Sequence, residues 1–343
     1  MDLKQRFQQN LPGVFFLEND TIAVNKYLQQ QGWLQANETV ISLEKPGEGN
    51  MNFVLRAITN QRSFILKQAR PWVEKFPQID APVERVAVEA QFFQSLQTIH
   101  SINTFIPKCL GFDETNFILA TEDLGKGADY SFLYQKDNVL THSDIEGLTQ
   151  YLSTLHQVAI PVDFPDNLAM RGLNHEHIFN FPYLEENGFN LDEVQVGLQA
   201  AAMPYKTNVA LKEKINACGT IYLAKGNHLL HGDFYPGSWL KVADGLKVID
   251  PEFGFIGPAE LDLGILIAHL IMAEQPTTII QTILNKYPKG LDFKAELLAQ
   301  FVGIEILRRL IGIAQLPLSL DLAAKKGLME QAANWIIAEK LAF

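Results

Sequence analysis

The sequence predicts a two-lobed α+β fold, with a small β-rich N-terminal lobe followed by a larger, mainly helical C-terminal lobe. Short apolar runs separated by turn residues crowd the chain between residues 40 and 121 and indicate strands. Beyond residue 127, apolar residues recur mainly at helical spacing. We therefore expect two lobes, residues 1–124 and 125–343, with the polar, glycine-containing segment Glu122–Gly127 at their boundary.

The N-terminal lobe is expected to combine five short strands with two helices. The first three apolar runs are close enough to form an antiparallel meander. The predicted strands are Val40–Glu44, Phe53–Ile58, Ser63–Lys67, Phe105–Leu110 and Asn116–Thr121. Helices are predicted at Val24–Leu34 and Val83–Gln97. In the second helix, Val88, Phe92 and Leu96 lie four residues apart on one apolar stripe.

The C-terminal lobe is expected to be helical with little strand. The segment Ser143–Glu146 has the pattern of a capping box and predicts the start of a helix. Leu148, Leu152 and Leu155 would form the buried face of that helix. Two short apolar runs predict strands in this lobe: His228–Leu230 and Leu246–Ile249.

Composition excludes several classes of protein. The chain has 343 residues, of which 47% are hydrophobic, enough for a substantial core. Its net charge of −11 repels phosphate backbones and anionic lipid, so we expect neither a nucleic-acid nor a membrane partner. The most apolar stretch, Leu261–Ala273, is too short to span a bilayer. Two cysteines without metal-site spacing and a start without an apolar signal core predict a cytoplasmic protein.

Two polar clusters, His231–Ser238 and Val248–Phe253, each follow a short apolar run. They contain Asp233, Asp250 and Glu252, which we expect to lie on loops leaving one hairpin. Phosphoryl transfer to a hydroxyl uses such a set, with one carboxylate for the hydroxyl proton and others for Mg²⁺ on the phosphates. The alternative is two hairpin loops that merely carry Asp at turn positions.

The combined pattern, HGD and a later Ser, then DPEFxFxGP and DxG, resembles the kinase family of aminoglycoside phosphotransferases, choline kinases and methylthioribose kinases. The resemblance is greatest to the methylthioribose kinases. It implies a protein kinase-like fold, ATP and Mg²⁺ as cofactors, and a small-molecule hydroxyl acceptor. It also implies that Asp233 is the catalytic base and that Asp250, Glu252 and Ser238 bind the metal.

A turn-rich loop between the first two strands is similar to the glycine-rich loop of this family. Gly47 and Gly49 would let the backbone approach phosphates closely, and Asn50 belongs to the same motif. A third glycine is missing, and the chain contains no GxxxxGK[ST] motif of the Walker type.

Lys67, at the end of a predicted strand, is expected to reach the α- and β-phosphates of a nucleotide. Its predicted partner is Glu89, which shares a helix face with Phe92 and Phe93 and would need a cation if buried. The competing partner is Glu84, at the helix start, where an acidic residue is usually solvated. The resemblance also implies that backbone groups of Glu122 and Leu124 bind adenine, although this segment could be a plain connector.

Arg308 and Arg309 lie on a helix whose other positions are apolar, so each needs an anion nearby. One alternative is an ion pair with Glu305. The resemblance implies instead that the arginine pair faces the substrate and the transferred phosphoryl group. It further implies that Asp262 and His231 brace the loop that carries the base.

The resemblance leaves the acceptor open. The segment Phe234–Pro236 departs from the methylthioribose kinase pattern, and residues 161–225, which would shape the acceptor pocket, carry no recognised motif. Three functions remain as hypotheses: a kinase for a methylthioribose-like sugar, a kinase for an aminoglycoside, a choline-like amino alcohol or another sugar, and a catalytically silent nucleotide-binding protein. A homodimer is expected from the resemblance alone.

Overall fold

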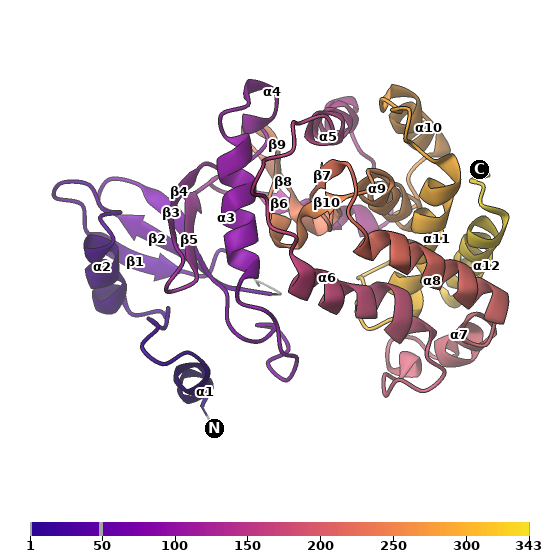
Figure 1. The fold of residues 1–343 in the computed structure, drawn as a ribbon, viewed down its shortest axis with the longest axis horizontal. Coiled ribbons are helices and arrows are strands. Elements are labelled where there is room, and N and C mark those ends of the chain that lie inside the picture. The colour runs from indigo at the N-terminus through magenta and orange to yellow at the C-terminus, as the bar shows by residue number, and fades with distance from the viewer. Residues whose placement is uncertain (1, 48–50, 343) are drawn as a thin grey trace. The chain divides into compact units, whose positions relative to one another are not determined.

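The computed structural model describes residues 2–47 and 51–342, and the chain divides into two units. Unit 1 comprises Met1–Gly127 and Lys247–Phe253, and unit 2 comprises Ala128–Leu246 and Gly254–Phe343. Unit 1 is built around a sheet and unit 2 mainly from helices, so the predicted α+β class is confirmed (Figure 1). The segment 247–253, which the sequence-based division assigned to the C-terminal lobe, belongs to unit 1.

A five-stranded antiparallel sheet with the order β1-β2-β3-β5-β4 forms the centre of unit 1. Its strands are β1 (Val40–Glu44), β2 (Phe53–Thr59), β3 (Ser63–Gln68), β4 (Cys109–Asp113) and β5 (Ile118–Glu122). The central strand β3 pairs Lys67 with Val54 of β2 and with Leu119 of β5. Lys67 is therefore held from both sides by backbone pairing.

Strand alternation gives the sheet of unit 1 two different faces. One face packs Leu55, Phe64 and Leu66 against Tyr27 and Leu28 of helix α2 (Thr21–Gln30). Because neighbouring residues of a strand point to opposite faces, Lys67 points away from this core. On that other side lies helix α3 (Arg85–Leu96), which contacts β4 and β5.

Several predicted boundaries in unit 1 are off by one or two residues, and those of two elements are off by three or four. The run Phe105–Leu110 becomes a strand only from Cys109 onward, because helix α4 (His100–Asn103) and a turn precede it and bury Ile106. The first predicted helix begins and ends earlier, because the Asp20 side chain accepts hydrogen bonds from two helix amides. Gly32, with φ of 67°, then follows the end of that helix. Helix α1 (Leu3–Asn10) was not predicted.

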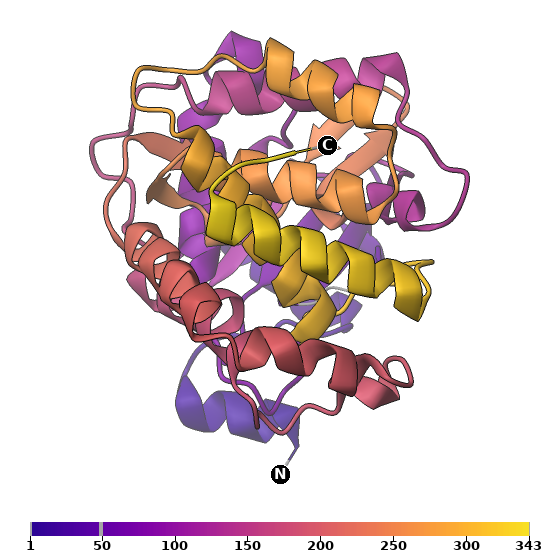
Figure 2. The ribbon, with the colours of Figure 1, turned by 90° about the vertical axis from the view of Figure 1, so that its right-hand side faces the viewer.

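Unit 2 is organised around two buried helices, α9 (Glu260–Met272) and α11 (Ala295–Ile311). Nearly every side chain of α9 is buried, as expected for a helix that is apolar on all sides. Helix α11 packs between α9 and the last helix, α12 (Leu322–Ala338), which crosses the view in yellow in Figure 2. The remaining helices are α5 (His142–Leu155), α6 (Leu168–His175), α7 (Leu198–Lys206), α8 (Val209–Leu223) and α10 (Thr277–Lys286). Among the described residues, no helix has the length and apolar character needed to cross a membrane.

The predicted N-cap of α5, Ser143, was wrong by two residues. The N-cap is Thr141, whose backbone N–H donates to the Asp144 carboxylate while the Asp144 N–H donates to the Thr141 hydroxyl. Asp144, rather than Glu146, therefore completes the capping box. The capping-box signal, an acidic residue three positions after the N-cap, was correct. The N-cap, however, is Thr141 rather than Ser143, and the acidic residue is Asp144.

The predicted single hairpin around the carboxylate clusters is not formed. Strand β7 (His228–Leu230), which precedes Asp233, pairs with β10 (Phe255–Gly257). The predicted strand at Leu246–Ile249 is β9 (Gly245–Val248), which belongs to a sheet with the order β6-β8-β9. The other two strands of this sheet are β6 (Ala128–Asp129) and β8 (Trp239–Val242). Three strands were missed because each has only two to four residues.

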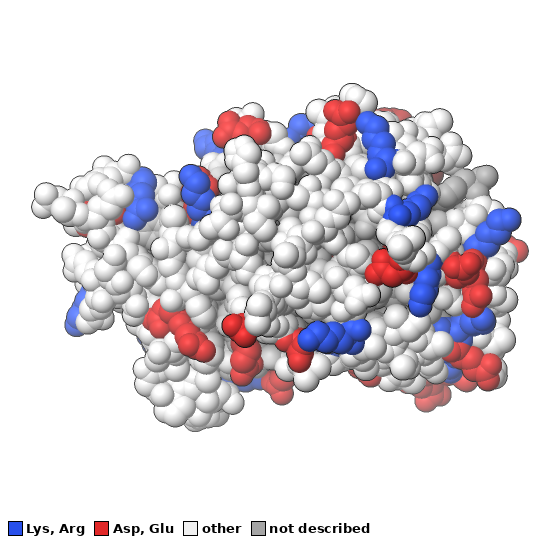
Figure 3. Space-filling model, turned by 45° about the horizontal axis from the view of Figure 1, so that its top comes forward, with Lys and Arg blue, Asp and Glu red and all other residues white. Residues whose placement is uncertain are grey.

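Charges on the protein surface are mixed. On the face drawn in Figure 3, basic and acidic side chains lie next to one another, and neither sign gathers into a large patch. The excess of acidic residues is therefore dispersed on this face rather than concentrated.

The packing of α11 against α12 predicts the effect of two glycine substitutions. A Cβ at Gly303 would lie 2.5 Å from the Ala332 carbonyl oxygen, so G303A should lower the free energy of unfolding by about 1–3 kcal/mol. A Cβ at Gly327, on the exposed side of α12, would meet no atom within 4 Å. G327A is the matched control and should raise stability by about 0.5–1 kcal/mol. Urea unfolding of both variants measures this, and equal effects would contradict the close helix contact.

Candidate functional site

Lys67 in unit 1 is enclosed by carboxylates. Its ammonium donates to Glu89 Oε1 at 2.7 Å and to Asp250 Oδ1. Burial alone would lower the pKa of Lys67, but Asp250 and Glu89 outweigh burial and hold the pKa above its usual value. The predicted Lys67–Glu89 pair is thus present, whereas Glu84 is exposed at the start of α3.

Asp250 begins the turn that carries the second carboxylate cluster. Its φ of 62° lies in the left-handed region, which Asp tolerates better than most residues other than glycine. The short 3₁₀ helix Pro251–Phe253 follows and packs against α3. The side chain of Asp250 is 43% exposed. It therefore offers a hard, accessible carboxylate, the donor type that Mg²⁺ prefers.

Glu252, two residues later, has a different environment. It is buried, and its Oε2 accepts a hydrogen bond from Asn52 Nδ2 at 2.8 Å and lies 3.3 Å from Arg85 Nε. Burial raises the pKa of Glu252 despite the opposing effect of Arg85. In the described part of the chain, no group of three or more His, Cys, Asp or Glu side chains is arranged to hold a metal ion. Asp250 fits Mg²⁺ better than Glu252 does.

Arg85 is a site residue that the sequence did not reveal. Its guanidinium is fully buried and donates to Asn52 Oδ1 and to the carbonyl oxygens of Met51 and Arg70. It thereby links the segment after β1 to the Glu252 turn. The available signal was its position: a cation in the first turn of a helix opposes the helix dipole and needs strong acceptors elsewhere.

The segment after β5 is fixed by Asp123. This carboxylate accepts hydrogen bonds from Arg56, from Ser63 Oγ at 2.6 Å and from the backbone N–H of Gly125. The N–H of Glu122 donates to Lys108 O. Leu124 is partly exposed in this segment. The adenine-binding role of Glu122 and Leu124 stays a prediction.

Of the three residues predicted for the glycine-rich loop, the structure describes only Gly47. Gly47 is exposed, and a Cβ there would meet no atom within 4 Å. Among the described residues, no contact requires glycine at this position, and its predicted role toward a nucleotide stays a prediction. Gly49 and Asn50 lie outside the described residues.

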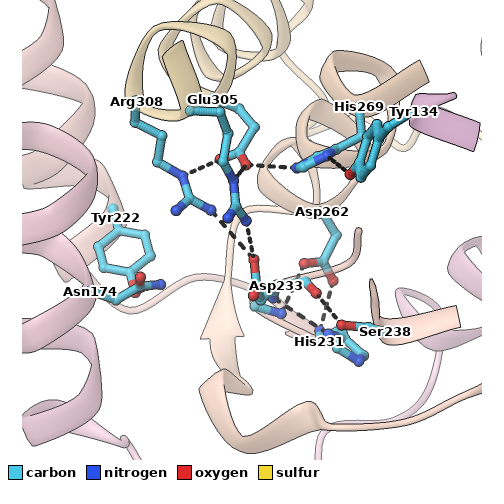
Figure 4. A network of polar contacts seen from close by, with 12 residues as sticks. Tyr134, Asn174, Tyr222, His231, Asp233, Ser238, Asp262, His269, Glu305 and Arg308 are labelled. Atoms are coloured by element: carbon cyan, nitrogen blue, oxygen red, sulfur yellow. Dashed lines mark hydrogen bonds and ion pairs between the residues drawn. The ribbon is translucent and has the colours of Figure 1, made fainter. Parts of the chain in front are cut away.

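In unit 2, Asp262 holds the loop that carries Asp233. Its carboxylate accepts hydrogen bonds from the backbone N–H of His231 at 2.7 Å and of Gly232 at 2.9 Å. Gly232 has φ of 84°, which makes glycine the suitable residue at this turn. Ser238 is buried and closes the loop by donating its hydroxyl to Asp233 O at 3.0 Å (Figure 4). The bracing role predicted for Asp262 is confirmed.

Ser238 was predicted as a metal ligand together with Asp250 and Glu252. It belongs to unit 2, whereas the two carboxylates belong to unit 1. Within its own unit, the Ser238 hydroxyl serves the Asp233 loop. Its role toward a metal stays a prediction.

Asp233 faces both arginines of α11. Its Oδ1 lies 3.1 Å from a terminal nitrogen of Arg309 and 3.4 Å from one of Arg308 (Figure 4). Both arginines also bind Glu305 through Nε. The Glu305 ion pair therefore forms, and the outer nitrogens of both arginines are directed at Asp233. The predicted role of Arg308 and Arg309 toward the substrate and the transferred phosphoryl group stays a prediction.

Comparison with known proteins identifies the family. The model of the phosphotransferase enzyme family matches residues 50–297, which is most of the chain. This chain belongs to the phosphotransferase enzyme family. The predicted family resemblance is thus confirmed.

This phosphotransferase family member is similar to known methylthioribose kinases. It is 26% identical over 250 residues to methylthioribose kinase 1 of Oryza sativa subsp. japonica, covering 68% of this chain and 56% of the relative. It is 28% identical over 276 residues to the methylthioribose kinase of Cronobacter sakazakii, covering 75% of this chain and 66% of the relative. The match thus spans less than two thirds of the length of either relative.

A solved structure shows the same fold. Spectinomycin phosphotransferase, in complex with ADP and spectinomycin, has a TM-score of 0.53 and 12% identity, over 94% of this chain and 99% of that chain. The likeness concerns the fold, and it confirms the predicted kinase-like fold of this phosphotransferase family member.

The burial of Arg85 predicts a large stability effect. Replacing it in R85L would leave the buried Glu252 without its cation, so the unfolding free energy should fall by about 3–5 kcal/mol. K286M is the control, because Lys286 and its partner Glu146 are 45% and 53% exposed, so losing this surface pair should cost much less stability. Denaturant unfolding measures the loss of stability in both variants. A loss in R85L no greater than in K286M would show that Arg85 does not hold this turn.

Proposed function

We propose that this protein is an ATP- and Mg²⁺-dependent kinase that transfers the γ-phosphoryl group to a hydroxyl of a methylthioribose-like sugar. The observation that carries the proposal is the Lys67 ammonium, held by Glu89 and Asp250 in one unit. This is the arrangement that kinases use to bind phosphates beside a metal-binding carboxylate. Membership of the phosphotransferase family and similarity to methylthioribose kinases support the same chemistry.

On the nucleotide side, Lys67 would neutralise charge on the α- and β-phosphates, with Glu89 fixing its direction. Asp250 is the proposed Mg²⁺ ligand, because its carboxylate is accessible; Glu252 and Ser238 are weaker candidates, because each is buried and engaged. A Mg²⁺ ion held by Asp250 would offset negative charge on the phosphates. The remaining proposed nucleotide contacts are Gly47, Gly49, Asn50, Glu122 and Leu124.

On the acceptor side, Asp233 would orient the attacking hydroxyl and accept its proton. Its loop is fixed by Asp262 and Ser238, so the carboxylate is held in place before the acceptor arrives. Arg308 and Arg309 would stabilise charge on the phosphoryl group during transfer.

The charges around Asp233 favour a neutral acceptor over a cationic one. The carboxylates of Asp233 and Glu305 are matched by the guanidinium groups of Arg308 and Arg309. A polycationic aminoglycoside or a choline-like amine placed here would meet two guanidinium groups, and repulsion at short range costs more in a buried site than in water. A sugar hydroxyl meets no such penalty.

Residues 161–225, which carry no recognised motif, are expected to contribute to the acceptor pocket. The 3₁₀ helix Phe181–Tyr183 and helix α8, both within this segment, contact α11, the helix that carries Arg308 and Arg309. We therefore assign part of the acceptor pocket to this segment.

An acceptor panel tests the proposed function. ATP consumption with Mg²⁺ should be strong with methylthioribose and weak with choline, aminoglycosides and homoserine, because only the first is an uncharged sugar. Simple pentoses control for the methylthio group. Strong turnover of an aminoglycoside would refute the acceptor class and keep the kinase. Measured MgATP binding without any turnover would indicate an acceptor outside the panel or a catalytically silent relative.

Two carboxylate substitutions should have separable effects. D233N should lower kcat by about 10²–10⁴-fold with little change in MgATP affinity, because it removes the proposed proton acceptor and leaves the proposed nucleotide-binding residues of unit 1 unchanged. D250N should weaken MgATP binding, because it removes the accessible metal-binding carboxylate. D244N is the control, since Asp244 is exposed in the turn between β8 and β9. Steady-state kinetics and MgATP titration measure both effects, and full kcat in D233N would contradict its role as base.

A further inference from the structure

Within unit 2, a chain of buried polar side chains leads away from Asp233 (Figure 4). Behind the two arginines, Glu305 Oε1 lies 2.8 Å from His269 Nε2, and His269 Nδ1 lies 2.6 Å from the Tyr134 hydroxyl. Tyr134, His269 and Glu305 are all at most 3% exposed. We refer to these three residues as the Glu305 relay. None of them has a role in the chemistry described above.

Helix geometry explains how one carboxylate can hold two neighbouring arginines. Consecutive residues of an α-helix point about 100° apart, because one turn takes 3.6 residues. Glu305 precedes Arg308 by three positions and Arg309 by four, so it lies between the two directions on the helix surface. Oε2 binds Nε of Arg308 and Oε1 binds Nε of Arg309 at 2.8 Å. With both Nε atoms fixed, the terminal nitrogens of both guanidinium groups extend to the same atom, Asp233 Oδ1.

The protonation states of the relay follow from its surroundings. Burial lowers the pKa of His269 to about 4, so the imidazole is neutral near neutral pH. Against the effect of burial, the two arginines hold the pKa of Glu305 well below its usual value, so this carboxylate is ionised and only accepts hydrogen bonds. The single imidazole proton must therefore lie on Nε2 and point to Glu305. Nδ1 is then an acceptor, and the Tyr134 hydroxyl donates to it.

We propose that Glu305 is a positioning residue for phosphoryl transfer, held in place by His269 and Tyr134, and that it locks both guanidinium groups onto Asp233. The inference rests on the proposed kinase function. The relay fixes the direction of each arginine before substrate binds, which lowers the reorganisation needed during transfer. Tyr235 adds a second restraint, because its ring lies 4.9 Å from the Arg309 guanidinium.

A purely structural role would not require this arrangement. Replacing a buried ion-pair network by apolar side chains of similar volume is often neutral or stabilising. Here the network instead delivers two guanidinium groups to one oxygen of the candidate base. Because both guanidinium groups point to Asp233, we infer that the network positions the arginines rather than only supporting the fold.

Two tyrosines on the same 3₁₀ helix, Tyr130–Tyr134, provide a matched test. Both are buried, and each hydroxyl makes a 2.6 Å hydrogen bond: Tyr134 with His269, and Tyr130 with Asp144 outside the relay. Y134F and Y130F should lose similar stability. Only Y134F should lower kcat, by about 3- to 10-fold, with the KM for ATP unchanged. Equal kcat values in Y134F and Y130F would overturn the proposal.

A stronger variant removes the charge of Glu305. E305Q should lower kcat by about 10²-fold, because one amide cannot hold both Nε–H groups in place. E38Q is its control, since Glu38 is a buried carboxylate paired with Arg62 in unit 1. Basal hydrolysis of MgATP, in which water replaces the acceptor, gives the same comparison without an identified sugar. No difference between E305Q and E38Q in either reaction would contradict the inference.

Nitrogen NMR separates failure of this inference from failure of the proposed function. The ¹⁵N shifts of His269 should show a neutral ring protonated at Nε2 from pH 6 to 8, and the Nε–H groups of Arg308 and Arg309 should exchange slowly. Both signatures should persist in a protein that turns over no acceptor. E305Q should abolish slow exchange of both arginines, whereas E38Q should leave it intact. Slow exchange retained in E305Q would show that Glu305 does not hold the pair.

Discussion

Buried charges must be paired, and this constraint shapes both functional regions of the protein. In unit 1, Lys67 lies between Glu89 and Asp250, and Arg85 forms an ion pair with Glu252. In unit 2, a single carboxylate, Glu305, serves two arginines. In each region, the partner of a functional group is therefore as important as the group itself. The pairing places the charges where phosphate and substrate chemistry would need them, and it restricts how far they can move.

The same constraint explains how short loops become rigid. Backbone amides at a tight turn need acceptors, and Asp262 supplies both of its oxygens to the loop before Asp233. Asp123 does the same for the segment after β5. A carboxylate without a proposed part in transfer, Asp262, thus fixes the loop that carries the proposed base.

Prediction from sequence succeeded for strand β1, because alternation and flanking turn residues are local signals. It also succeeded for the Lys67–Glu89 pair, because a buried carboxylate needs a cation and the family resemblance indicated Lys67. Prediction failed where a distant segment decided the outcome. The strand before Asp233 pairs with β10 rather than with β9, and Arg85 finds its acceptors in Asn52 and in backbone carbonyls of separate segments. No spacing along the chain encodes these contacts.

The sequence by itself determined the fold class and the residue types of the site, because periodicity and motif spacing are properties of neighbouring residues. It also placed Glu305 three and four positions before the arginines, which helix geometry converts into a shared contact. Only the tertiary structure decided which alternatives hold. It showed that the arginines bind Glu305 and reach Asp233 together, and that Glu252 is engaged while Asp250 is accessible. The physical reason is that burial and the direction of a side chain depend on elements far away in the chain, and these determine which charges are paired within the protein.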